Sequence, residues 1–190
     1  MKLDLRSRAD ALSAAIAGGV WTAGATVEPE TAAARVVDWL KGTRAQRRRV
    51  FIVGNGGSAA VAAHACTDFL NMCKLSATTL HEPAMLTCMS NDYGYEHAFA
   101  RMLRQHAGPG DMLVAISSSG KSANIRNAVA AFREAGGGHV FTLSGFAADN
   151  PLRSLGDMNL WLDSTNYGIV EIGHQFMLHN LSDRIAAEAA

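Results

Sequence analysis

Two loops rich in glycine and serine carry the residue types that bind phosphate groups. The first is Gly-Asn-Gly-Gly-Ser at 54–58, and the second is Ser-Ser-Ser-Gly-Lys-Ser at 117–122. Small residues let main-chain N–H groups approach an anion, hydroxyls add further donors, and the N-terminus of a following helix favours negative charge. Neither loop matches the GxxxxGK[S/T] or GxGxxG patterns of nucleotide sites. The two loops therefore predict a phosphate site of another kind, with simple turn and helix-cap chemistry as the alternative.

A second group of residues could bind a metal ion or move protons. His64 and Asp68 are four residues apart, so they project from one face of the helix expected after the first loop. The C-terminal helix adds Glu171, His174 and His179. Eight residues separate Glu171 from His179, a rise of roughly 12 Å and a rotation of roughly 80°, so two long side chains could just share one ion. Zinc accepts imidazole and carboxylate ligands, whereas hydrogen bonding without an ion is the other interpretation of the His64–Asp68 spacing.

Short apolar runs are expected to position both groups. Runs rich in β-branched residues and followed at once by glycine or serine are typical of strands buried on both faces of a sheet. Such strands are expected at 50–53, 112–116 and 139–143, with weaker ones at 78–80 and 160–162. Their alternation with helical stretches indicates βαβ units. We therefore expect an α/β fold, a three-layer sandwich around a central parallel sheet of about five strands, whose carboxyl-terminal edge carries the site.

Two helices are expected ahead of the first strand. One runs from Leu3 to about Ala17 and ends at Gly18-Gly19, where the backbone can leave the helical conformation. The other runs from about Pro29 to Lys41. A chain of 190 residues fits a single domain. Within it, we expect residues 1–47 to serve in packing or oligomerisation and residues 48–190 to form the α/β core.

The bulk composition restricts the class of partner. Seventeen basic residues balance seventeen acidic ones, so the net charge does not favour nucleic acid. A basic cluster at 41–49 is expected to be a solvated helix end, with an anion or partner site as the alternative. No apolar stretch reaches the roughly 18 residues of a membrane span. Cys66, Cys73 and Cys88 form no CxxC pair, which favours reduced thiols in a soluble, cytoplasmic protein.

The order of three motifs resembles a known family. Gly-Asn-Gly-Gly-Ser at 54–58, Asn-Asp-Tyr-Gly at 91–94 and Ser-x-Ser-Gly-x-Ser-x-Asn at 117–124 are similar to the motifs of sugar isomerase (SIS) domains, and in particular of the phosphoheptose isomerases. The resemblance extends from about Val50 to the C-terminus, and two N-terminal helices are part of it. It implies a flavodoxin-like sandwich and a homotetramer in which neighbouring subunits complete each site.

The resemblance also assigns roles to individual residues. It implies that the serines of the second loop hold the phosphate and that Asn55, Ser58 and Asp92 hold sugar hydroxyls. The full set of implied substrate-binding residues is Asn55, Gly56, Gly57, Ser58, Asp92, Ser117, Ser118, Ser119, Ser122 and Glu171. The implied ligands of one zinc ion per subunit are His64, Asp68, Glu171 and His179. His174 is expected to be structural or to lie at a subunit contact.

The reaction that the resemblance implies is an aldose–ketose isomerisation through a cis-enediol, in which sedoheptulose 7-phosphate becomes D-glycero-D-manno-heptose 7-phosphate. Asp68 is the expected base for the carbon-bound proton, His179 is the expected acid for the neighbouring oxygen, and zinc would polarise the carbonyl. Met72 and Gly168 stand where the family has an arginine and an aspartate, so a related ketose phosphate is a further candidate substrate. The alternative class is a sugar-phosphate-binding SIS module that acts through protein partners without turnover.

Overall fold

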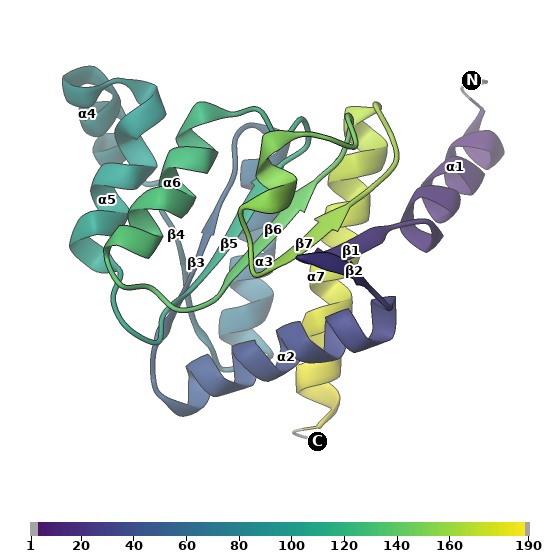
Figure 1. Cartoon of the computed structure of the whole chain (residues 1–190), viewed down its shortest axis with the longest axis horizontal. Helices are drawn as coiled ribbons and strands as arrows, with labels where there is room; N and C mark the ends of the chain where they lie inside the picture. Colours follow the sequence, from purple (N-terminus) through teal and green to yellow (C-terminus); the bar gives the residue numbers. More distant parts are fainter. Residues whose placement is uncertain (1–3, 189–190) are drawn as a thin grey trace.

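The computed structural model describes residues 4–188, and within this range a seven-stranded sheet is covered by helices on both faces (Figure 1). The expected helix start at Leu3 lies outside the described residues. In spatial order the strands are β2, β1, β7, β6, β5, β3 and β4. Their bounds are Val20–Ala23 (β1), Ala25–Val27 (β2), Arg49–Val53 (β3), Ser76–Thr79 (β4), Met112–Ser117 (β5), Val140–Ser144 (β6) and Met158–Trp161 (β7).

Strands β4, β3, β5, β6 and β7 pair in parallel. Every residue of β5 and β6 is buried, because helices cover both faces of the sheet, and this explains their continuous apolar sequences. Strands β4 and β7 each begin two residues before the predicted positions. The predicted α/β sandwich with about five parallel strands is therefore confirmed.

The antiparallel hairpin of β1 and β2 is absent from the sequence-based prediction. Gly24, with φ of 79°, lies between the two strands, and β1 pairs antiparallel with β7. Trp21 is 2% exposed, and its ring stacks on that of Phe141 with 5.6 Å between centroids. Strands of four and three residues are too short for a periodic pattern, which is why only helices are expected for residues 1–47. This segment therefore contributes to the sheet as well as two helices.

Five of the described helices form two groups, one on each face of the sheet (Figure 1). Helices α2, α3 and α7 pack on the face where Val114 and Leu178 belong to one buried cluster. Helices α5 and α6 cover the other face with Phe99 and Phe132. The bounds are Leu5–Ala17 (α1), Pro29–Ala45 (α2), Gly57–Asn71 (α3), Pro83–Tyr93 (α4), Ala98–His106 (α5), Ala123–Glu134 (α6) and Tyr167–Ala187 (α7). Helix α2 thus continues four residues beyond the predicted Lys41.

Residues 81–106 form α4, a short 3-10 helix at Tyr95–His97 and α5, although the sequence patterns predict no element there. Helix α4 begins at Pro83, and the Glu82 side chain accepts hydrogen bonds from its first N–H groups. No residue of α4 is buried, so the helix lacks the apolar stripe by which helices are recognised. A second 3-10 helix spans Pro151–Ser154. Among residues 4–188, no helix combines the length and the apolar character that crossing a membrane requires.

Candidate functional site

The first loop joins β3 to α3, and its close contacts leave no room for a side chain at Gly54. A Cβ on Gly54 would lie 2.5 Å from the carbonyl oxygen of Ser58, so a side chain cannot be accommodated. Gly56, with φ of 54°, precedes α3, and no side chain caps this helix. The ring Nε2 of His81 donates to the carbonyl oxygen of Gly54 at 3.0 Å. The loop is therefore fixed in place while the first N–H groups of α3 remain available to an anion.

The second loop joins β5 to α6 and leaves hydroxyls free. Gly120 has φ of 64°, and a Cβ there would overlap the side chain of Asn150, so glycine is required at this turn. Ser117 Oγ donates to Ser122 Oγ at 3.2 Å. The Ser122 side chain makes no cap hydrogen bond with α6, and the buried hydroxyl of Ser118 has no partner among the described residues. An unpaired buried hydroxyl costs free energy, and a bound acceptor would remove that cost.

Both loops line one pocket of ≈ 250 Å³, which we call the serine pocket. The N-termini of α3 and α6 meet there, at the carboxyl ends of β3 and β5. None of the described lysines or arginines lines it, so its donors are hydroxyls, amides and main-chain N–H groups. The lining residues are Asn55, Gly56, Gly57, Ser58, Ile116, Ser117, Ser118, Ser119, Ser122, Tyr167 and Glu171. The structure thus brings together every predicted substrate-binding residue except Asp92.

A pair of side-chain amides links the two loops. Asn55 Nδ2 donates to Asn124 Oδ1 at 2.9 Å, and Asn124 Nδ2 donates to Asn55 Oδ1 at 2.8 Å. The Tyr95 hydroxyl donates to the same Asn55 oxygen at 2.7 Å. Asn124 ends the motif at 117–124, but the sequence assigns it no role. Tyr95 is not predicted as a site residue, and its only signal is its position directly after the Asn-Asp-Tyr-Gly motif. Both residues help to build the site.

Glu171 belongs to the serine pocket and lies outside the group of possible metal ligands. Its carboxylate lies so close to Gly57 that a Cβ on this glycine would overlap it. Burial raises the pKa of Glu171, because desolvation disfavours the charged form. The predicted sharing of one ion by Glu171 and His179 is not seen in this arrangement. The reason is that the two side chains contact different turns of α3, Glu171 at Gly57 and His179 at Asp68.

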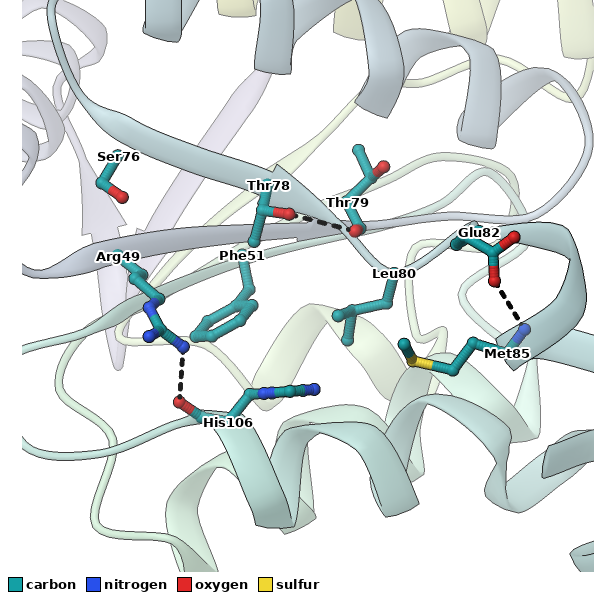
Figure 2. A pocket seen from close by; sticks show the side chains of 9 residues that line it. All are labelled: Arg49, Phe51, Ser76, Thr78, Thr79, Leu80, Glu82, Met85 and His106. Carbon is teal, nitrogen blue, oxygen red and sulfur yellow. Dashed lines mark hydrogen bonds between the residues drawn. The ribbon is translucent and has the colours of Figure 1, made fainter.

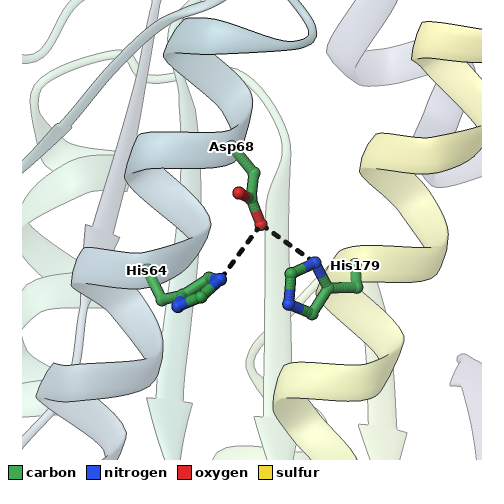
Figure 3. Close-up of side chains that lie close together, drawn as sticks. All are labelled: His64, Asp68 and His179. Atoms are coloured by element: carbon green, nitrogen blue, oxygen red, sulfur yellow. Dashed lines mark ion pairs between the residues drawn. The ribbon is translucent and has the colours of Figure 1, made fainter.

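His64, Asp68 and His179 form a close group between α3 and α7, which we call the His–Asp–His group (Figure 3). Asp68 Oδ2 lies 3.6 Å from His64 Nε2 and 3.0 Å from His179 Nδ1. The centroids of the two imidazole rings are 4.8 Å apart. One possible ligand atom from each of the three residues lies within 4.8 Å of the others. The structure therefore brings together three of the four predicted metal ligands.

The His–Asp–His group fits a divalent cation. Asp68 Oδ2 is buried and has no hydrogen-bond partner among the described residues, so the approach of His179 Nδ1 is not aligned as a hydrogen bond. A buried, charged oxygen without a donor requires compensation, which a cation can supply. Two imidazoles and one carboxylate are also a ligand set of catalytic zinc sites, which keep one position open.

Two further residues considered from the sequence lie away from the serine pocket. Asp92 is exposed in the last turn of α4, where Asn91 Nδ2 donates to it at 3.0 Å and Cys88 Sγ lies 3.6 Å away. His174 is completely buried, and its Nε2 donates to the carbonyl oxygen of Ser144 at 3.0 Å. Burial lowers the pKa of His174 to about 4. His174 is therefore structural, which is one of its two expected roles.

A larger pocket of ≈ 380 Å³ lies beside the edge strand β4, and none of the predicted site residues lines it (Figure 2). Phe51 and Leu80 contribute its apolar surface. Its charged side chains already have structural contacts, since Arg49 Nη1 donates to the carbonyl oxygen of His106 at 3.4 Å and Glu82 caps α4. The smaller serine pocket is therefore the better candidate for chemistry.

The serine pocket and the His–Asp–His group are joined by two helices that both begin at the pocket. His64 follows Gly57 by seven residues on α3, which corresponds to roughly 10 Å along the helix axis. His179 follows Glu171 by eight residues on α7, which corresponds to roughly 12 Å. Side chains on a helix lean toward its N-terminus, so those of the His–Asp–His group lean back toward the pocket.

Comparison with known proteins gives the family. The family model described as the SIS domain matches residues 23–143. The phosphoheptose isomerase of Citrifermentans bemidjiense is 32% identical over 166 residues, which is 84% of this chain and 83% of the relative. The structure of a phosphoheptose isomerase from Neisseria gonorrhoeae superposes with a TM-score of 0.81 at 27% identity, covering 95% of this chain and 94% of that one. The phosphoheptose isomerase from Francisella tularensis gives a TM-score of 0.81 at 25% identity, covering 96% and 94%.

This chain belongs to the SIS-domain family. The relatives and structures named above are phosphoheptose isomerases, so the resemblance found from the three motifs is confirmed.

Proposed function

We propose that this chain is a sugar-phosphate isomerase that interconverts sedoheptulose 7-phosphate and D-glycero-D-manno-heptose 7-phosphate. The separation of the serine pocket from the His–Asp–His group, roughly 10 Å along α3, is the observation that carries the proposal. An open heptose chain measures roughly 9 Å from phosphorus to the second carbon, if bonds of about 1.5 Å form an extended zigzag. A phosphate in the serine pocket would therefore bring the reacting carbons to the His–Asp–His group.

The residues of the His–Asp–His group suit the proton transfers of an aldose–ketose isomerisation. Such a reaction needs a base that moves a carbon-bound proton and an acid that serves the neighbouring oxygen. The side chain of Asp68 is only 15% exposed, so its carboxylate is shielded from water and can act as the base. His179 Nδ1 lies 3.0 Å from Asp68 Oδ2. The His179 side chain would transfer the proton of the substrate oxygen next to the reacting carbon. When bound by His64, Asp68 and His179, a zinc ion would supply Lewis-acid polarisation of the carbonyl.

The proposal includes a cytoplasmic homotetramer. The thiols of Cys66, Cys73 and Cys88 are free, which supports a reducing compartment. Two large apolar side chains of α7, Ile172 and Phe176, are 56% and 49% exposed. Contact with a second copy would remove them from water. A mass of four chains in light scattering is the expected result, and a monomeric mass at micromolar concentration would contradict this part of the proposal.

The catalytic proposal is tested by turnover. Purified protein with zinc is incubated with sedoheptulose 7-phosphate, and the aldose product is followed by NMR. We expect product with the native protein and a rate about 10²- to 10⁴-fold lower with Asp68→Asn, because general base catalysis contributes about that factor. Fructose 6-phosphate, whose chain is one carbon shorter, is expected to react more slowly. Binding of sedoheptulose 7-phosphate without any turnover would reject the isomerase and favour a sugar-phosphate-binding module.

A further inference from the structure

The hydrogen bonds of Asn55 leave it with one free donor. An asparagine amide has two N–H donors and an oxygen with two acceptor positions. In Asn55 the oxygen accepts from Tyr95 at 2.7 Å and from Asn124 at 2.8 Å, and one N–H donates to Asn124 at 2.9 Å. Asn55 is half-buried and lines the serine pocket, whereas the side chains of Tyr95 and Asn124 do not. The second N–H of Asn55 is therefore the group that remains for a ligand.

Tyr95 determines which end of the Asn55 amide faces the ligand. The amide pair of Asn55 and Asn124 could also form with both amides reversed, so the pair alone does not fix the orientation. In the reversed state, the Tyr95 hydroxyl would have to accept from an N–H, and an oxygen of Asn55 would face the pocket. Glu171 already places a carboxylate in that pocket, so a second acceptor there would disfavour an anionic ligand. The donating Tyr95 hydroxyl therefore stabilises the orientation that an anion needs.

The backbone of Tyr95 is anchored to the helix that carries Asn124. Asn127 Nδ2 on α6 donates to the carbonyl oxygen of Glu96 at 2.9 Å. Glu96 follows Tyr95 in the short 3-10 helix, and Asn124 lies one turn before Asn127 on α6. The hydrogen bond between α6 and the 3-10 helix thus holds the Tyr95 hydroxyl and the Asn124 amide in place relative to each other, and both contact Asn55.

We propose that Tyr95 is a positioning residue that sets the polarity of Asn55, so that Asn55 offers a single N–H donor to an acceptor oxygen of the bound sugar phosphate. The identity of that ligand rests on the proposed function. The orientation of the Asn55 amide, which we call its polarity, is inferred only from the hydrogen bonds of Asn55.

The ranking of two substitutions at Asn55 tests the polarity. Asn55→Asp keeps the shape and both hydrogen bonds that the oxygen accepts, but it removes the donor, whereas Asn55→Ala removes the side chain. We expect calorimetry with sedoheptulose 7-phosphate to show affinity about tenfold lower for Asn55→Ala, and lower still for Asn55→Asp. Ala60→Asp is the control for charge alone, because Ala60 is exposed near the start of α3 and does not line the pocket. Asn55→Asp binding as well as Asn55→Ala, or better, would overturn the proposal.

Tyr95→Phe tests the positioning role and decides the question if Asn55→Asp fails to fold. Its control is Tyr93→Phe, since Tyr93 is similarly exposed and its hydroxyl makes none of the hydrogen bonds found within residues 4–188. We expect Tyr95→Phe to raise KM about threefold with kcat unchanged, and Tyr93→Phe to change neither. Equal KM values for the two variants would overturn the role of Tyr95.

If the native protein binds sedoheptulose 7-phosphate without turnover, the proposed function fails, and the affinities of the same variants for this sugar phosphate are ranked by calorimetry. If the native protein does not bind sedoheptulose 7-phosphate, inorganic phosphate is the probe in the same calorimetry.

Discussion

The carboxylate of Glu171 occupies the space that a side chain on Gly57 would need, at the first turn of α3. Glu171 therefore places a carboxylate at a helix N-terminus, which is also the position that favours an anionic ligand. It is also the only acidic side chain among the described residues that line the serine pocket. A phosphate bound in the pocket as proposed would thus face a carboxylate of the pocket itself.

Replacing Glu171 by glutamine should strengthen phosphate binding. The substitution keeps the shape of the side chain and removes its charge, so the repulsion of a bound dianion is lost. At a separation of several ångströms in water this repulsion is worth about 1 kcal/mol, and we expect the Kd for inorganic phosphate to fall roughly fivefold in calorimetry. Asp10→Asn removes the charge of an exposed α1 residue that does not line the pocket, and it should leave the Kd unchanged. Weaker binding by Glu171→Gln would show that the carboxylate supports the ligand.

Zinc affinity should depend on the His–Asp–His group. We expect His64→Ala and His179→Ala each to lower the zinc affinity at least about tenfold, because each removes one ligand of a three-ligand set. Metal content after equilibrium dialysis, measured by mass spectrometry, provides the readout. His97→Ala is the control, since the His97 side chain is 52% exposed and lies beside Glu96 on another element. Equal zinc content in the native protein and in both ligand variants would rule out a metal site here.

Gly120→Ala should disable the serine pocket, and Gly24→Ala should not. Both glycines have positive φ, 64° and 79°, so alanine costs about 1 kcal/mol of backbone strain at either position. Only at Gly120 does the new methyl group also overlap another side chain, that of Asn150, whereas nothing lies within 4 Å of the corresponding position at Gly24. Urea unfolding should therefore show a larger loss for Gly120→Ala, and calorimetry should show lost phosphate binding for this variant alone. Equal losses for the two variants would contradict the contact with Asn150.

The stability of the fold should fall as the pH drops through the range between 6.5 and 4. Burial lowers the pKa of His174 from 6.5 to about 4, so the unfolded chain binds a proton in this range that the folded chain does not. The free energy of unfolding should decrease by about 2 kcal/mol between pH 7 and pH 5 from this residue. Burial also lowers the pKa of His81, which adds a change of the same sign.

Urea unfolding at the two pH values measures the effect of His174. His174→Asn should reduce the pH dependence, whatever its effect at pH 7, whereas His139→Gln should not, because the His139 side chain is 51% exposed. A pH dependence that is unchanged in His174→Asn would mean that the imidazole is already charged in the folded protein.

Local sequence signals predicted the loops of the site but not all of its contacts. The motifs at 54–58 and 117–122 follow buried strands, and parallel pairing brings the ends of such strands to one edge, so the serine pocket could be predicted. Helical spacing gave the distance from Glu171 to His179, but it could not show that Glu171 contacts Gly57 while His179 contacts Asp68. The Tyr95–Asn55 hydrogen bond joins residues 40 positions apart, and no periodic pattern signals such a contact.

The common starting point of α3 and α7 has a consequence for which sugars this protein can select. The proposed anchor for the anion lies at the start of these two neighbouring helices. The His–Asp–His group, which would transfer the protons, lies about halfway along them, with His64 in α3 and His179 in α7. Gly173 lets α7 pack closely on Leu162, because a Cβ at this glycine would meet the Leu162 side chain at 2.5 Å. Under the proposed function, the number of carbons that fit between the two places would depend on how far α7 is displaced along α3. Variants with an altered preference for sugar chain length are therefore expected to change the packing of α7 on Leu162 rather than the walls of the pocket.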